Sequence, residues 1–428
     1  MKFFKQWGSV MMAAATAHAK WEKDVSDTVF SSRKRVLMLG LLMLPVAVGG
    51  IAFADQIAGM LPEMIGGKTA YSPAFFTPTI FIASILIGMI AGLITGCIGA
   101  GGGFIIAPAL MSAGIKGILA VGTDLFHIFA KAIMGSVIHR KLGNVSVALA
   151  FIFLIGSIIG ATVGGVINRV LYEINPVLSD AFITTIYSIM LGFLGAYSMI
   201  DFFKANKAAD TGGAHGGKSE GAELGPLPKK LQAIRIPPMI TFDQSLIPGG
   251  RRISCVFLIL SGALVGLAAA IMGVGGGFLT FPIFVYILGV SSMTTVGTDI
   301  FQIVFTAGYA AISQYAIYGF IFYTLAMGML LGSLVGIQIG AMVTKVVKGI
   351  TIRGFYAIAV MSGFINRVFA LPGKLSSMEV IHLSKSTITV LNAIGTYAFF
   401  IVLGTFGVWV IGTFFVNIKT LKGGEVAS

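Results

Sequence analysis

Two short segments of the chain combine residue types that could bind an anion in apolar surroundings. Residues 99–108 read GAGGGFIIAP, and residues 273–282 read GVGGGFLTFP. Consecutive glycines each cost a helix about 1 kcal/mol, so each segment predicts a break between two helical segments. A helix that starts after such a break offers free N–H groups at the positive end of its dipole, and glycine lets an anion approach closely. The alternative is that these glycines only let helices pack closely. We predict a substrate site that includes Gly99, Gly101, Gly102, Gly103 and Pro108 from the first segment, and Gly273, Gly275, Gly276, Gly277 and Pro282 from the second.

A second motif follows each glycine segment: VGTDLF at 121–126 and VGTDIF at 296–301. On a helix, residues four apart share a face, so each motif begins a polar stripe inside an apolar run. An ionisable residue in such a run is a candidate functional residue. We add to the predicted substrate site Thr123, Asp124, His127 and Lys131 from the first stripe, and Thr298, Asp299 and Gln302 from the second, in which Thr306 takes the place of the lysine.

Each polar residue of the stripes also has a simpler interpretation. The Thr-Asp pairs could act as helix caps or bond locally to backbone. Lys131 is either the counter-charge for an anionic substrate or the neutralising partner of Asp124. His127 could carry a proton near neutral pH, or simply be hydrogen-bonded.

The elements that position these residues are membrane-spanning helices. Apolar residues make up 56% of the 428-residue chain and charged residues 11%, whereas a soluble protein would have about a quarter charged. Several nearly uncharged runs exceed 18 residues, which is typical of helices that cross a bilayer. The net charge of +13 would indicate nucleic-acid binding in a soluble chain. Here it reflects cytoplasmic loops, which collect Lys and Arg, and we expect the bilayer and not nucleic acid as a partner.

The duplicated motifs predict two transport repeats of opposite orientation. If the N-terminus is inside and each segment after the glycines is a helical hairpin, the inner segments hold 22 of the 29 Lys and Arg residues. Each repeat then has an odd number of crossings, which predicts the inverted-topology architecture of many secondary transporters. The length of the first hairpin limb leaves open whether the hairpins stop within the membrane or cross it.

We therefore expect an all-α polytopic protein of the inner (plasma) membrane with both termini in the cytoplasm. The expected parts are a cytoplasmic N-terminal segment, first helix and outer loop at 1–78, repeat 1 at 79–201, a cytoplasmic linker at 202–252, inverted repeat 2 at 253–372, and an outer loop, last helix and cytoplasmic tail at 373–428.

Several other residues have simpler roles in this interpretation. The lysine-containing N-terminus resembles a secretory signal, but its spacing of apolar residues favours a helix lying on the membrane surface. Cys97 and Cys255 are expected to be buried thiols, without a disulfide or metal site. Lys116 lies at the predicted turn of the first hairpin, and Arg169 and Arg367 are expected to anchor helix ends by snorkelling. We expect neither a cofactor nor a catalytic residue.

The duplicated GxGGGxxxxP segment, followed each time by a VGTD motif, resembles the TauE/SafE family of sulfite exporters and permeases for small anions. The resemblance covers about 79–201 and 253–372, and the glycine motif is its more characteristic part. It implies that Gly99–Gly103, Pro108, Thr123 and Asp124, with Gly273–Gly277, Pro282, Thr298 and Asp299, line a transport route. The N-terminal helix, the long linker and the long final apolar run depart from a compact member.

The interpretation is thus a secondary transporter of sulfite, sulfate or an organosulfonate that works by alternating access. Its energy would come either from an ion gradient, with a proton or sodium ion as the coupling ion, or from the gradient of the substrate. Its direction and oligomeric state cannot be read from the sequence. One alternative is an intramembrane aspartyl protease using Asp124 and Asp299, although each aspartate follows threonine where the known signature has glycine. A membrane scaffold or sensor acting through the linker is the other alternative.

Overall fold

The structure is a computed structural model that describes residues 78–98, 102–141, 145–210, 226–243, 250–344, 346–347 and 349–418. This part of the chain is helical apart from one two-stranded sheet. Eight of its helices are long and apolar enough to cross a membrane. The prediction of an all-α polytopic membrane protein is therefore confirmed. The expected surface helix and first spanning helix lie outside the described residues.

The helices fall into two series joined by a small linker unit. The first series is α4 (Pro78–Ile98), α5 (Gly103–Ser112), α6 (Gly117–Lys141), α7 (Val147–Ile174) and α8 (Pro176–Asp210). The linker unit is α9 (Pro226–Ala233), β1 (Met239–Phe242) and β2 (Arg251–Ser254). The second series is α10 (Cys255–Met272), α11 (Gly277–Pro282) with the π-helix η2 (Ile283–Leu288), α12 (Ser292–Tyr309) with η3 (Ala310–Tyr315) and η4 (Ala316–Tyr318), α13 (Tyr323–Val343) and α14 (Gly349–Ser377). A last helix, α15 (Lys385–Val416), packs on α14.

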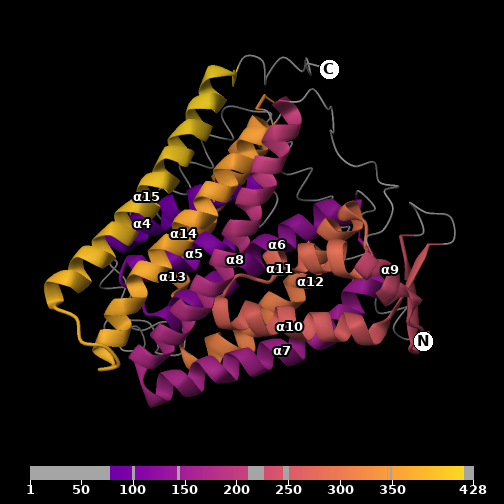
Figure 1. Ribbon diagram of the computed structural model, residues 1–428, viewed down its shortest axis with the longest axis horizontal. Helices are drawn as coiled ribbons and strands as arrows, with labels where there is room; N and C mark the ends of the chain where they lie inside the picture. The colour runs from indigo at the N-terminus through magenta and orange to yellow at the C-terminus, as the bar shows by residue number, and fades with distance from the viewer. Residues whose placement is uncertain are drawn as a thin grey trace, which may run out of the picture.

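The two series exchange helices. The first helix of series 1, α4, packs along α13 of series 2, and the first helix of series 2, α10, packs along α7 of series 1; α7 and α10 lie side by side along the lower edge of Figure 1. The two helices of each pair run parallel. They approach closely because glycines recur every four residues on the facing surfaces. The contact glycines include Gly328, Gly332, Gly336 and Gly340 on α13, and Gly156, Gly160 and Gly164 on α7.

Equivalent helices of the two series pair in opposite directions. Along α8 and α14, Gly192 lies against Phe364, whereas Gly354 lies against Phe202 further along α8. Along α6 and α12–η3, Gly122 lies against Tyr315, whereas Gly308 lies against Phe129. Both equivalent pairs are therefore antiparallel. An axis perpendicular to the helices relates the two series, and the predicted inverted repeats are present.

The first hairpin consists of one short and one long limb. At about 1.5 Å per residue, the ten residues of α5 span roughly 15 Å, half of a bilayer core of about 30 Å. The second limb, α6, has 25 residues. Gly102, just before α5, lies against Ala91 in the interior of α4. The first limb thus begins beside the middle of α4 and is a half-length helix.

The linker unit packs on the second repeat. Its strands are antiparallel, with Met239 opposite Ser254 and Phe242 opposite Arg251. Phe242 and Ile253 join a buried cluster with residues of α7 and η2. The start of the expected linker differs from the prediction, because α8 continues as helix to Asp210. Residues 211–225 and 244–249 lie outside the described part.

Candidate functional site

The two glycine segments meet at the centre of the molecule. A Cβ on Gly103 would lie 3.2 Å from the Cα and carbonyl oxygen of Val274, which stands inside the second segment. The N–H of Gly102 donates to Thr95 Oγ1 at 2.8 Å. In the second segment, Gly273, Gly275 and Gly276 have φ of 79°, 69° and 89°, values that glycine adopts without strain. Backbone from both repeats therefore forms one junction, although Gly99 and Gly101 lie outside the described residues.

Three side chains donate hydrogen bonds to the carbonyl oxygens at the end of α10, just before the second glycine segment. Asn168 Nδ2 donates to the carbonyl oxygens of Ala270 and Ile271 at 3.3 and 3.1 Å. Tyr315 OH donates to Ala270 O at 2.6 Å, and Tyr187 OH donates to the last carbonyl of the helix. A helix end inside a protein needs such partners. Sequence reasoning missed all three residues, because they lie far along the chain from α10.

Arg367 corrects one sequence expectation. Instead of snorkelling at a helix end, it is 2% exposed and its Nη2 donates to Pro108 O at 3.1 Å and Ser112 Oγ at 2.6 Å. Its guanidinium also bonds to the side-chain oxygen of the neighbouring Asn366. Arg367 therefore ties α14 to the end of α5. The carbonyls of Ala109, Leu110 and Met111 at that end accept backbone N–H groups of the following turn.

Arg169 and Lys116 also have partners within the protein. Arg169 Nη1 donates to Gln314 O at 2.9 Å and Gln314 Oε1 at 2.7 Å, and its guanidinium lies 4.1 Å from the centre of the Tyr318 ring. Lys116 Nζ donates to Tyr172 OH at 3.0 Å. Both residues fasten elements together instead of extending into lipid headgroups.

The first polar stripe places a carboxylate against a histidine in a fully buried site. Asp124 and His127 both have no exposed surface. Asp124 Oδ1 lies 3.5 Å from His127 Nδ1, and His127 Nε2 lies 2.8 Å from Ser333 Oγ on α13. Among the described residues, neither carboxylate oxygen of Asp124 nor Nδ1 of His127 has a hydrogen-bond partner. Buried polar atoms without a hydrogen-bond partner are costly.

The second polar stripe is fully hydrogen-bonded. Gln302 Nε2 donates to Asp299 Oδ1 at 3.0 Å, and Thr306 Oγ1 donates to Gln302 Oε1 at 2.7 Å. Ser157 on α7 lies 2.6 Å from Thr306 Oγ1 and completes the chain as its donor. The other oxygen of Asp299 lies 3.0 Å from the position of a Cβ on Gly277, so the carboxylate covers the second glycine segment. The two repeats thus place a polar stripe at the same position, but the stripe is an Asp–His pair in the first repeat and a chain of hydrogen-bonded neutral side chains ending at Asp299 in the second.

Lys131 lies beside the first glycine segment. Its Nζ is 3.4 Å from Thr95 Oγ1, the atom that accepts the N–H of Gly102. Its side chain is half-buried, and no ion pair joins it to Asp124 in the described part of the chain. Lys131 therefore places a positive charge at the junction of the glycine segments, and this charge is not in direct contact with a described carboxylate.

The threonines of the two VGTD motifs bind helix starts of the opposite repeat. Thr123 Oγ1 accepts the N–H of Phe322, the residue before α13, at 2.9 Å. Thr298 Oγ1 accepts the N–H of Ser146, the residue before α7, at 2.9 Å. This supports the capping interpretation of the threonines, with the correction that each caps a helix of the other repeat. Pro282 ends α11, but its side chain is outside the described set.

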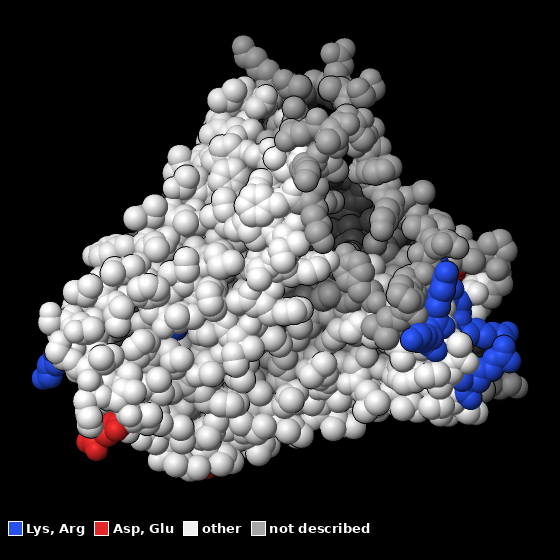
Figure 2. All heavy atoms as spheres, in the orientation of Figure 1, with Lys and Arg blue, Asp and Glu red and all other residues white. Residues whose placement is uncertain are grey.

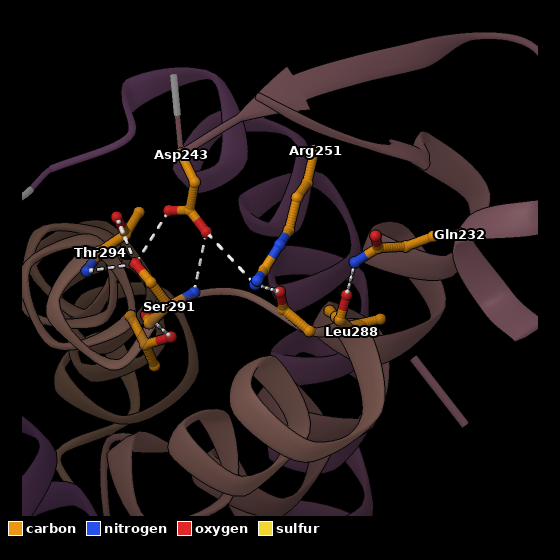
Figure 3. Close-up of polar contacts among 8 residues, drawn as sticks. Gln232, Asp243, Arg251, Leu288, Ser291 and Thr294 are labelled. Carbon is orange, nitrogen blue, oxygen red and sulfur yellow. Dashed lines mark hydrogen bonds and ion pairs between the residues drawn. The ribbon is translucent and has the colours of Figure 1, made fainter. Parts of the chain in front are cut away.

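An aspartate outside the hairpin holds the tip of each hairpin. In repeat 1, Asp180 Oδ1 accepts the N–H of Gly117 at 2.7 Å, and its other oxygen pairs with Lys374 at 3.0 Å. In repeat 2, the linker residue Asp243 accepts the N–H of Ser291 and its Oγ, both at 2.9 Å (Figure 3). The tips therefore sit on different supports, the first on α8 and α14 and the second on the linker unit.

Comparisons with known proteins agree with this architecture. The profile of the family "Sulfite exporter TauE/SafE" matches residues 84–367. "Probable membrane transporter protein YjnA" of Bacillus subtilis is 26% identical over 269 residues, 61% of this chain and 89% of that protein. "Sulfite exporter TauE/SafE family protein 3" of Arabidopsis thaliana is 29% identical over 169 residues, 38% of this chain and 35% of that protein. No solved structure gives a significant match. With its eight candidate spanning helices, the chain is a multi-pass membrane transporter that belongs to the TauE/SafE sulfite exporter family.

Proposed function

We propose that the protein is a secondary transporter of a small oxyanion such as sulfite, sulfate or an organosulfonate, and that it works by alternating access. The observation that carries the proposal is the junction where Gly103 of repeat 1 meets Val274 of repeat 2 beside Lys131. Rocking one inverted repeat against the other would expose this junction first to one side and then to the other. The name of the matched family supports sulfite as the first anion to test.

In this proposal Lys131 supplies the charge that recognises the anion. A half-buried ammonium beside the start of α5 attracts an oxyanion more strongly than a solvated lysine does, because little water screens it. Ile128 packs against Gly103 and Gly275 in this structure, so in this proposal the anion reaches the glycine backbone only when the repeats move apart. Gly102, Gly103 and Gly275–Gly277 are the described glycines that would surround it.

We further propose that a proton shared by Asp124 and His127 couples to transport. Ser333 Oγ donates its only hydrogen to Gly88 O at 3.0 Å, so it accepts from His127 Nε2. A neutral imidazole then has a bare Nδ1, which faces Asp124 Oδ1 at 3.5 Å. A single proton, carried either by His127 Nδ1 or by Asp124 Oδ1, would allow the two atoms to form a hydrogen bond. Lys131 is the ionisable neighbour whose charge acts on both members of this pair.

Transport accounts for the two aspartates better than proteolysis does. An aspartyl protease needs two carboxylates that share a proton. Here the neighbour of Asp124 is His127, and Asp299 accepts from Gln302, so in the described residues each pairs within its own helix. A scaffold or sensor would leave the buried Asp124–His127 pair without a role. We propose the inner membrane, with cytoplasmic termini, as the location.

Uptake and counterflow in proteoliposomes test the proposal. The panel is sulfite, sulfate, thiosulfate and short sulfonates, each with and without a proton or sodium gradient. We expect saturable flux of at least one anion, and Lys131→Gln should raise its half-saturating concentration about tenfold or more, the value of one charged hydrogen bond. Lys385→Gln at the exposed start of α15 removes the same charge as a matched control. No flux across the panel, or equal effects of the two variants, would refute the anion site.

A further inference from the structure

A cavity of about 310 Å³ lies in the linker unit, away from the junction of the glycine segments. It is lined by Gln232, Arg235, Met239, Gly250, Arg251 and Arg252. On the face shown in Figure 2, Lys and Arg gather at this end of the molecule, whereas the surface over the helices is almost uncharged. Three of its lining residues are thus arginines, and the cavity lies outside the proposed transport site.

Two of the three arginines have no carboxylate partner among the described residues. Arg251 lies 4.0 Å from Asp243, whose two oxygens already accept hydrogen bonds from Ser291. Arg235 and Arg252 are exposed and form no ion pair with any described residue. Guanidinium groups present paired N–H donors that match the oxygens of a phosphate. The charge and the donor set of the cavity therefore favour an oxyanion.

The same residues that line the cavity hold the tip of the second hairpin. Arg251 Nη1 donates to Gly289 O at 2.7 Å, and Gln232 Nε2 donates to Leu288 O at 2.8 Å. Figure 3 shows both side chains reaching from the linker unit to the end of η2, next to the Asp243–Ser291 contacts. A ligand that orders Arg251 and Gln232 would thereby order the hairpin tip as well.

We propose that this cavity binds a phosphate group, either free or as the headgroup of an anionic phospholipid, and that binding fixes the tip of the second hairpin. The volume is at the small end of ligand sites, which span about 300–1,000 Å³, and suits a headgroup better than a nucleotide cofactor. A lipid source is sterically reasonable because β2 ends at Ser254 and the spanning helix α10 begins at Cys255. The cavity thus lies at the level of a membrane–water interface. The site is a regulatory one and separate from the proposed anion route.

Binding measurements on the full-length protein test the site. One arm titrates inorganic phosphate into protein held in phosphatidylcholine nanodiscs. A second arm measures retention of phosphatidylglycerol by native mass spectrometry. One of the two arms, inorganic phosphate or phosphatidylglycerol, should show binding to the wild-type protein. In that arm we expect the double variant Arg235→Gln, Arg252→Gln to bind at least tenfold more weakly. The double variant Lys229→Gln, Lys230→Gln removes equal charge from the exposed surface of α9 next to the cavity and should retain binding. Binding that survives in the arginine variant, or falls equally in both variants, overturns the site.

Hydrogen exchange tests the connection to the hairpin. Inorganic phosphate or phosphatidylglycerol, whichever binds, should slow hydrogen exchange of the Ser291 amide in the wild-type protein. It should not do so in the double variant Arg235→Gln, Arg252→Gln. Binding without protection at Ser291 overturns the proposed coupling. Because Arg235 and Arg252 lie outside the proposed transport site, anion exchange should persist in the arginine variant. Ligand binding by a protein that transports no anion would refute the proposed function and leave this site standing.

Discussion

Substitution of Asp124 by asparagine separates proton coupling from anion movement. In the wild-type protein a proton can sit between Asp124 Oδ1 and His127 Nδ1, which are 3.5 Å apart. The asparagine amide donates to the same Nδ1 permanently and so mimics the protonated aspartate. The buried site keeps its hydrogen bond, but the variant has no proton to release.

The structure sets the size of the expected effect. Only the first repeat has a histidine in its stripe, since Gln302 takes this place in the second and satisfies Asp299 directly. One pair carries one proton per cycle, so a pH difference of one unit can drive an anion ratio of about tenfold, or about 1.4 kcal/mol. In Asp124→Asn we expect this ratio to fall to about one, while exchange of labelled anion across the membrane remains measurable.

The assay is accumulation of labelled anion in proteoliposomes after a pH jump, with the membrane potential clamped. Glu379→Gln, which removes an exposed carboxylate between α14 and α15, is the matched control and should retain accumulation. Undiminished accumulation by Asp124→Asn would refute the reasoning. A ratio near a hundredfold in the wild-type protein would show that a second proton moves with the first.

Three further predictions concern stability, each checked by denaturant titration in detergent. Thr123→Val should lower the free energy of unfolding by about 1–3 kcal/mol, because it leaves the buried amide of Phe322 ahead of α13 without an acceptor. Thr298→Val should lower it less, because the amide of Ser146 is only part-buried. Equal stability of the wild-type protein and both variants would contradict this prediction. Gly332→Leu should prevent tight packing of α13 on α4, whereas Gly404→Leu on α15, where a Cβ meets nothing within 4 Å, should be tolerated. Arg367→Met should cost about 1–3 kcal/mol by removing the buried hydrogen bonds to Pro108 O and Ser112 Oγ. Arg367→Lys should not restore the lost stability, as a snorkelling role would allow.

The duplicated motifs predicted the inverted repeats because symmetry between two segments is visible within a single sequence. GAGGG and GVGGG, each followed by VGTD, also predicted where the repeats come together. Composition and hydropathy were enough for the polytopic class, because a bilayer demands long apolar helices. Assignment of the individual site residues as substrate ligands stays a prediction.

Partners distant in the chain could not be predicted. Arg367 looked like an interfacial anchor because its own triplet gives no sign of its contacts with Pro108 and Ser112 of α5, more than two hundred residues earlier. Likewise Asn168, Tyr187 and Tyr315 stand in ordinary apolar helices, and only the fold brings them to the end of α10. The linker showed charge in its sequence but no sign that Asp243 and Arg251 would reach the second hairpin.

The exchange of helices between repeats has a consequence for biosynthesis. When α4 enters the membrane, its glycine-lined partner α13 has not yet been made, and the start of α13 in turn depends on Thr123 of the first repeat. Neither half can therefore complete its packing alone, and a nascent chain must hold the first half loosely in lipid until translation of the second half is nearly finished. The same interlocking means that two separately synthesised halves carry all the contacts needed to find each other. An ancestor containing a single repeat would have needed two copies inserted in opposite orientations.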